Sequence, residues 1–326
     1  TDHLDTANSY GDLGLSYELA GDYESALPQY QKSLEIIKET LGTEHLDAAT
    51  AYGKLGYLYT TIGQFELALP LSQKALRITK EILGEEHRDT SFSYTALGYV
   101  YHSMGKYELA LPLYQKALEI DKGVFGENHL HTGPSYTYLG LLYEKAGKYE
   151  LALPLYQKVI EIYKEVLGEN HPDTATSYGN LGLLYKSMGK YELALPLYQK
   201  SLKIRQEVLG EKHPSTATSY ANLGLLYSSL SQYEAALPLY QKALEIDKEV
   251  LGEKHPSTAT SYNNLGLLYS SLSLYEAALP LLRKSLEIDK EVFGENHPST
   301  ATSYNNLGQV YDLMGKYEAA LPLYQK

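Results

Sequence analysis

Apolar residues recur along this chain at helical spacing, in pairs of segments that repeat every 42 residues. In the block 169–210, the first stripe falls at i, i+3, i+4, i+7 and i+10, on the residues Tyr178, Leu181, Gly182, Tyr185 and Met188. A second stripe in the same block follows on Ala194, Tyr198, Ser201, Leu202 and Val208. Spacing of this kind places side chains on one face of a helix, so each block is predicted to be a pair of helices.

The block occurs eight times, and one glycine marks every copy: Gly14, Gly56, Gly98, Gly140, Gly182, Gly224, Gly266 and Gly308. A repeat can bury its apolar face only against its neighbours, so such a chain folds as a stacked array. We therefore expect an all-α solenoid of helix-turn-helix repeats, forming one domain over residues 1–326. Its units are predicted at 1–42, 43–84, 85–126, 127–168, 169–210, 211–252, 253–294 and 295–326, the last incomplete.

Proline and glycine mark the expected helix ends. Pro172 suits the first turn of a helix, and Asp173 or the residue just before it is expected to cap the free amides there. Gly189 should end the first helix and Gly210 the second, since glycine readily adopts the left-handed conformation. Two copies have serine at the first of these corners, and we expect those corners to be less stable or differently shaped: Ser231 and Ser273.

Two further positions are constant within the helices. A glycine inside a helix, such as Gly182, costs about 1 kcal/mol relative to alanine, so its recurrence predicts a close helix contact, here with the small Ala194. Pro196 has a counterpart about one turn into every second helix. Because proline removes one amide hydrogen bond, we expect a local kink or a late helix start there.

The block resembles the tetratricopeptide repeat, whose signature positions match Leu181, Gly182, Tyr185, Gly189, Tyr191, Ala194, Tyr198 and Ser201. That repeat is about 34 residues long, so the 42-residue period here implies a second helix longer by roughly two turns. The long form, with its VLGExHP linker and SYNNLGLLY segment, is similar to the repeats of kinesin light chain and of related bacterial proteins. The resemblance implies a right-handed superhelix that holds a peptide or partner domain in a concave groove and performs no chemistry.

One variable column on the first helix runs Asp12, Lys54, Ala96, Tyr138, Asn180, Asn222, Asn264 and Asn306. In the resembled family, asparagines at this column face the groove and hydrogen-bond the backbone of a bound peptide. An amide suits that role because it both donates and accepts. The alternative is that these asparagines are solvated residues copied by duplication. Two neighbours one position earlier join the candidate set: Asn263 and Asn305.

A second column on the same helix is apolar in seven of its eight copies and runs Leu15, Tyr57, Tyr99, Leu141, Leu183, Leu225, Leu267 and Gln309. These side chains either contact the ligand or pack between adjacent first helices, and the sequence leaves both interpretations open. Aromatic residues enrich the N-terminal half, where a different ligand segment is expected to bind: Tyr57, Tyr99 and Tyr138.

Histidine also recurs once per repeat, as His3, His45, His87, His129, His171, His213, His255 and His297. Equivalent points of stacked helix pairs lie on the order of 10 Å apart, too far for ligands that must reach within about 2 Å of one zinc ion. We therefore expect a linker role, such as capping the next helix, and no metal site; the closer pair His129 and His131 lacks a supporting carboxylate pattern. Nothing irregular suggests a catalytic centre or a cofactor site. Basic residues that would clamp a C-terminal carboxylate are not repeated either.

Composition narrows the classes of partner. The formal net charge of −12 opposes sequence-independent binding to nucleic acid and to anionic lipid. No segment has the roughly 18 consecutive apolar residues of a membrane span, so the chain is expected to be soluble. The absence of cysteine favours a cytoplasmic location.

The least regular segment is 123–134, GVFGENHLHTGP. Pro134 should delay the start of the next helix to about that residue, and we expect a weak point or bend that divides copies one to three from copies four to eight. The chain stops part-way through the last second helix, so we expect it to be a piece of a longer protein. Its uncapped terminal repeats are candidates for end-to-end self-stacking.

Three functions are compatible with these features. The first is a non-catalytic scaffold that binds a peptide or partner domain in its groove. The second is a structural spacer or self-assembly rod without a groove ligand. The third is a regulatory arm of a larger signalling protein.

Overall fold

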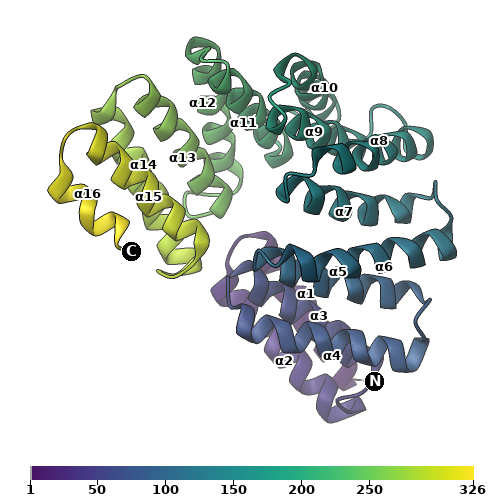
Figure 1. The fold of residues 1–326 in the computed structure, drawn as a ribbon. Coiled ribbons are helices and arrows are strands. Elements are labelled where there is room, and N and C mark those ends of the chain that lie inside the picture. The colour runs from purple at the N-terminus through teal and green to yellow at the C-terminus, as the bar shows by residue number, and fades with distance from the viewer. Residues whose placement is uncertain (1) are drawn as a thin grey trace. The chain divides into compact units, whose positions relative to one another are not determined.

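The computed structural model describes residues 2–326, which form sixteen α-helices and one short 3-10 turn (Figure 1). The odd-numbered helices, called first helices below, are α1 (Asp2–Leu19), α3 (Leu46–Thr61), α5 (Arg88–Ser103), α7 (Gly133–Lys145), α9 (Pro172–Ser187), α11 (Pro214–Ser229), α13 (Pro256–Ser271) and α15 (Pro298–Leu313). The even-numbered second helices are α2 (Tyr23–Leu41), α4 (Phe65–Leu83), α6 (Tyr107–Phe125), α8 (Tyr149–Val166), α10 (Tyr191–Leu209), α12 (Tyr233–Val250), α14 (Tyr275–Phe293) and α16 (Tyr317–Tyr324). No strand occurs in this part of the chain, and the predicted all-α helical-repeat solenoid is confirmed.

The helices group into two compact units of four repeats each, one ending at Gly168 and the other covering Glu169–Lys326. Within each unit, the two helices of a repeat pack against each other, and the second helix packs on the first helix of the next repeat. Buried aromatic and aliphatic residues fill these contacts, such as Tyr30 and Ile78 in the first unit and Tyr198 in the second. The single-domain assignment stays a prediction.

The irregular segment 123–134 delays a helix but does not divide the array. As predicted, α7 begins late, at Gly133, after the 3-10 turn η1 (Leu130–Thr132). A Cβ atom at Gly133 would lie 2.4 Å from the Tyr163 ring, so only glycine fits there. Thr132 Oγ1 donates to the Gly126 carbonyl at 2.8 Å and so ties the third repeat to the fourth. The compact units divide after Gly168, so the division predicted after the third copy is wrong.

Histidine caps the N-terminus of the first helix in six repeats, and in the fourth it caps the 3-10 turn η1 that precedes α7. In each, the Nδ1 atom of the histidine accepts a hydrogen bond of 3.0–3.2 Å from the backbone N–H two residues later. The seven histidines are His45, His87, His129, His171, His213, His255 and His297. This interaction satisfies one of the free amides of the helix start and confirms the predicted linker role. Asp173 is not the cap; its own N–H donates to His171 Nδ1 at 3.2 Å.

The two kinds of corner differ in backbone conformation. Gly189, after α9, is left-handed with φ 70°, as predicted. Gly210, after α10, also has a positive φ, 90°, in the region that favours glycine, as predicted, but its ψ of 165° gives this corner a more open shape. Ser231 adopts the Gly189 conformation with φ 57°, and the following amide keeps its bond to the Tyr227 carbonyl at 2.9 Å. The serine corners therefore keep the shape of the glycine corners, at the strain of a non-glycine residue with positive φ.

The recurrent glycine of the first helix makes room for a tyrosine ring in six repeats, while Gly56 faces Ser72 and Gly266 faces Leu282. A Cβ atom on Gly182 would lie 3.0 Å from Tyr198 Cε1, so the close partner is this ring rather than the predicted Ala194. Pro196 lies inside α10, which begins at Tyr191, and the late-start interpretation is therefore wrong.

Candidate functional site

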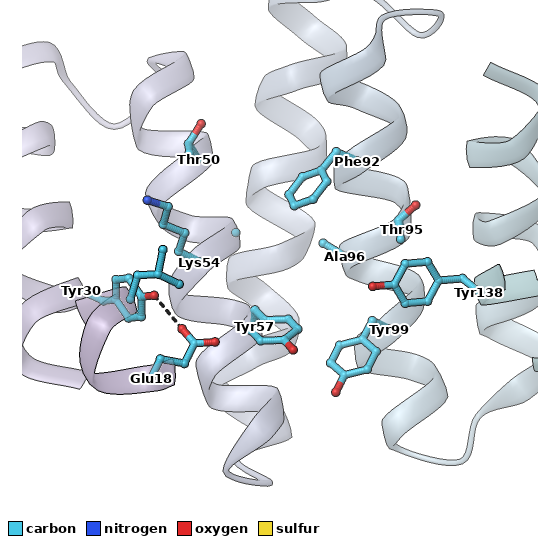
Figure 2. Close-up of a pocket in the computed structure, with 12 residues that line it drawn as sticks. Glu18, Tyr30, Thr50, Lys54, Tyr57, Phe92, Thr95, Ala96, Tyr99 and Tyr138 are labelled. Atoms are coloured by element: carbon cyan, nitrogen blue, oxygen red, sulfur yellow. Dashed lines mark hydrogen bonds between the residues drawn. The ribbon is translucent and has the colours of Figure 1, made fainter. Parts of the chain in front are cut away.

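A hollow of about 450 Å³ opens on the first helices of the first unit (Figure 2). We call the surface that the first helices form the first-helix face. The lining residues come from α1, α2, α3, α5 and α7 and define what we call the aromatic hollow: Leu15, Glu18, Tyr30, Thr50, Gly53, Lys54, Tyr57, Phe92, Thr95, Ala96, Tyr99 and Tyr138. The structure thus brings together three of the candidate residues, Tyr57, Tyr99 and Tyr138, from three successive first helices.

Aromatic rings form the walls of the aromatic hollow. Tyr57 and Tyr99 stack with ring centroids 5.3 Å apart and an angle of 20° between the rings (Figure 2). Tyr138 is held from behind by Tyr114, whose ring stacks on it at 5.6 Å. Phe92 is 72% exposed and Tyr57 is 45% exposed, so apolar ring surface faces solvent. Such surface is the part of a protein that gains most from being covered by a partner.

Polar groups at one end of the aromatic hollow are mutually satisfied. The Tyr30 hydroxyl donates to Glu18 Oε2 at 2.6 Å (Figure 2). Burial raises the pKa of Glu18 above its ordinary value, against the opposing effects of the Tyr30 hydrogen bond and the Lys54 charge. Burial also raises the pKa of Tyr57 to about 12, so its hydroxyl stays neutral at physiological pH. The hollow therefore presents neutral aromatic surface with one acid and one base at its edge.

The predicted asparagine ladder lies on α9, α11, α13 and α15 of the second unit, with its side chains half buried. Asn306 Nδ2 donates to Asn263 Oδ1 at 2.8 Å, so these two side chains are paired with each other. Asn180, Asn222 and Asn264 make no side-chain hydrogen bond to another described residue, while Asn305 is exposed. The N-terminal part of the ladder thus keeps free amides, and its C-terminal member does not.

The three candidate leucines of the second unit pack between repeats. Leu183 lies against a cluster containing Leu223 of the next first helix. In the same way, Leu225 lies against a cluster containing Leu265 of α13, and Leu267 lies against a cluster containing Leu307 of α15. These leucines pack toward the next repeat and stay partly exposed, so their contact with a ligand stays a prediction.

Six residues that line the aromatic hollow belong to neither variable column identified from the sequence: Glu18, Tyr30, Thr50, Gly53, Phe92 and Thr95. Phe92 had a signal, because its column holds threonine in five other copies and an aromatic residue there is unusual. The column of Glu18 has no comparable signal, since it runs Glu18, Thr60, His102, Glu144, Lys186, Ser228, Ser270 and Asp312. Among residues 2–326, no group of three His, Asp or Glu residues could hold a metal ion. His129 and His131 lie ring against ring at 5.2 Å beside Phe125.

No helix among the described residues is long and apolar enough to cross a bilayer. A search of the curated proteins found no significant match to this sequence. Solved structures with a similar fold include the putative kinesin light chain repeats of Podosopora anserina, with 24% identity, a TM-score of 0.53, and coverage of 63% of this chain and 98% of that one. BtubC (BKLC) from P. vanneervenii has 22% identity and a TM-score of 0.53, with coverage of 73% of this chain and 92% of that one. The apo form of RapI has 18% identity and a TM-score of 0.63, with coverage of 88% of this chain and 98% of that one.

The family model described as tetratricopeptide repeat matches the chain in overlapping segments: 5–81, 47–123, 89–165, 132–207, 173–249, 229–291 and 258–326. These segments cover nearly all of the sequence, in agreement with the helix pairs and the resemblance to kinesin light chain-type repeats. The chain therefore belongs to the tetratricopeptide repeat family, whose fold is typical of non-enzymatic protein–protein interaction scaffolds.

Proposed function

We propose that this chain is a non-catalytic scaffold that binds an extended peptide, or an extended segment of a partner domain, along its first-helix face. The observation that carries the proposal is the aromatic hollow, where the exposed rings of Phe92 and Tyr57 converge with Tyr99 and Tyr138 around about 450 Å³. A space of that size accepts a large apolar side chain of the ligand. Covering the exposed rings supplies the favourable free energy of binding.

The free asparagines of the second unit support the same proposal. Asn180, Asn222 and Asn264 occupy equivalent positions of successive first helices and have no side-chain partner among the described residues. Their amides match the alternating N–H and C=O groups of an extended backbone. Each unit would bind its own extended segment, the first unit through an apolar side chain of that segment and the second through the backbone of another.

Selection from a random dodecapeptide display library against the immobilised chain tests the proposal. The affinity of a selected peptide for Phe92→Thr is expected to fall tenfold or more, because threonine is the residue of five other copies and removes only the ring. Leu109→Ala, which shortens an exposed side chain on α6, is the matched control and should change affinity less than twofold.

The asparagine contribution is measured with a selected peptide whose affinity is unchanged by Phe92→Thr, and which therefore binds outside the aromatic hollow. Asn222→Ala combined with Asn264→Ala should weaken binding several-fold, with the far-ultraviolet circular dichroism spectrum unchanged. Selection of no peptide above background would refute the scaffold proposal and favour a spacer without a groove ligand. A selected peptide that binds the Phe92 and asparagine variants with unchanged affinity would show that the first-helix face is not the binding surface.

A further inference from the structure

A second hollow, of about 360 Å³, lies between α13 and α15 of the second unit, on α14. We call it the acidic hollow, and its principal lining residues are Thr260 and Asn263 of α13, Asp289 and Phe293 of α14, and Thr302 and Ser303 of α15. Both threonines are exposed, whereas Asp289 is only 6% exposed. The carboxyl group of Asp289 therefore lies at the base of the hollow.

Asp289 has a hydrogen-bond donor but no cation. Ser303 Oγ donates to Asp289 Oδ2 at 2.5 Å. The nearest lysines in the sequence are engaged elsewhere, because Lys290 pairs with Glu295 at 2.8 Å and Lys284 with Glu287 at 3.5 Å. Burial raises the pKa of Asp289 above its ordinary value, and no neighbouring positive charge opposes that effect. A buried carboxylate without a counter-charge is costly, so a cation that entered the hollow would be strongly favoured.

Packing of the repeat does not require an acid at this position. The equivalent residue of the first repeat is Ile37, which is buried beside the corresponding hollow between α1 and α3. The third and sixth repeats also have an acid here, Asp121 and Asp247, and each accepts a hydrogen bond from a serine of the next first helix, as Asp289 does. In the hollow of the third repeat, Arg88 belongs to the lining and pairs with Asp89 at 3.2 Å. The serine bond of Asp289 links α14 to α15 through Oδ2 alone, so Oδ1 remains for a ligand cation.

We propose that the acidic hollow binds the side chain of a lysine or arginine of the partner peptide, with the ligand cation paired to the Asp289 carboxylate. This inference rests on the proposed function and specifies the chemistry of the ligand. The Phe293 ring offers apolar surface to the aliphatic stem of the side chain. The net charge of −12 attracts a basic segment over longer distances and repels an acidic one.

The test uses the whole chain, isotopically labelled for amide NMR, and titrates it with the probe peptide acetyl-Ala-Lys-Ala-Lys-Ala-amide. The matched probe replaces each lysine with norleucine, which keeps the aliphatic stem and removes the charge. Saturable shifts of the Ser303 and Asn263 amides are expected with the lysine peptide, with at least tenfold weaker binding of the norleucine peptide.

Two variants locate the charge on the protein. Asp289→Asn keeps the shape and an acceptor for Ser303, and should weaken binding of the lysine peptide tenfold or more. Glu287→Gln makes the same charge change at an exposed position of α14 and should alter affinity less than twofold. If asparagine disturbs the fold, Asp289→Ile serves as the second variant, because isoleucine occupies the equivalent position 37. It should abolish the shifts of the Ser303 and Asn263 amides.

Unchanged affinity of Asp289→Asn, or equal affinity for the two probes, would overturn the inference. If both probes shift amides of the first-helix face equally, peptide binding stands and only the acidic hollow is refuted. If neither these probes nor a library-selected peptide shifts any amide, the proposed function and this inference fall together.

Discussion

Replacing Gly98 with alanine tests the packing of a helix glycine against a tyrosine ring, which recurs in six of the eight repeats. Gly98 lies inside α5, and a Cβ atom there would lie 2.7 Å from Tyr114 Cε1 and 2.8 Å from Cδ1. The ring is 1% exposed, stacks on Tyr138 and meets the edge of His102, so it has no open space to move into. Overpacking of a core costs about 1 to 3 kcal/mol, and this confined ring places Gly98→Ala at the upper end.

The net effect follows by subtracting the intrinsic helix preference. Alanine is favoured over glycine within a helix by about 1 kcal/mol, so Gly98→Ala should lower the free energy of unfolding by about 2 kcal/mol. Gly53, inside α3 of the same unit, is the matched control, because a Cβ atom there meets nothing within 4 Å. Gly53→Ala should stabilise the protein by about 1 kcal/mol.

Urea denaturation followed by circular dichroism measures both variants. A double-mutant cycle adds Tyr114→Ala, which removes the clashing ring; in that background Gly98→Ala should become stabilising, as Gly53→Ala is. If Gly98→Ala stabilises the chain with the tyrosine present, the explanation of the recurrent glycine by ring packing is refuted. If the cycle shows no coupling, the cost arises elsewhere.

Four further substitutions have outcomes that the structure determines. Ser231→Gly should stabilise the protein by about 1 kcal/mol, since it relieves the φ of 57° at that corner, and a lower urea midpoint would contradict this. Tyr156→Phe should destabilise it by about 1 to 3 kcal/mol, because the Tyr156 hydroxyl donates to the buried Glu144 at 2.9 Å, whereas Tyr114→Phe should be nearly neutral because that buried hydroxyl has no partner. Equal unfolding midpoints for the two phenylalanine variants would argue against that hydrogen bond. Burial raises the pKa of Asp289 in the folded state. At low pH the carboxyl group is protonated and stabilises the folded chain, and this stabilisation is lost as the pH rises through the folded-state pKa. Asp289→Asn should therefore be more stable than the parent at pH 7 and lose this advantage near pH 3.5, and an advantage independent of pH would exclude the charge as its cause.

Local signals in the sequence were sufficient for the helices. Pro172, the late start of α7 caused by Pro134, and the left-handed Gly189 act within a few residues of themselves. Their effects depend on backbone geometry and can be predicted without knowing any neighbour. The positive φ of Gly210 was predicted in the same way, whereas its ψ of 165° depends on the linker that follows and not on glycine alone.

Contacts between repeats were harder to predict. Gly182 was assigned to a contact with Ala194, but the ring of Tyr198 lies closer, because a side chain on the second helix reaches along the helix axis as well as across it. Asn306 was expected to face a ligand, which stays a prediction, and the structure adds a bond to Asn263, which belongs to the neighbouring column. Residues of equal repeat position are therefore not always the ones that meet.

The sequence by itself determined the all-α repeat architecture and its family, because a 42-residue period repeats the same burial pattern and permits only stacking of like on like. It also separated constant packing positions from variable ones. Only the tertiary structure decided which variable residues converge: Phe92 with Tyr57 and Tyr99 in one hollow, and Asp289 without a cation at the base of another. The physical reason is that helical periodicity fixes which face a residue occupies, whereas helix offset and packing between repeats fix what that residue touches.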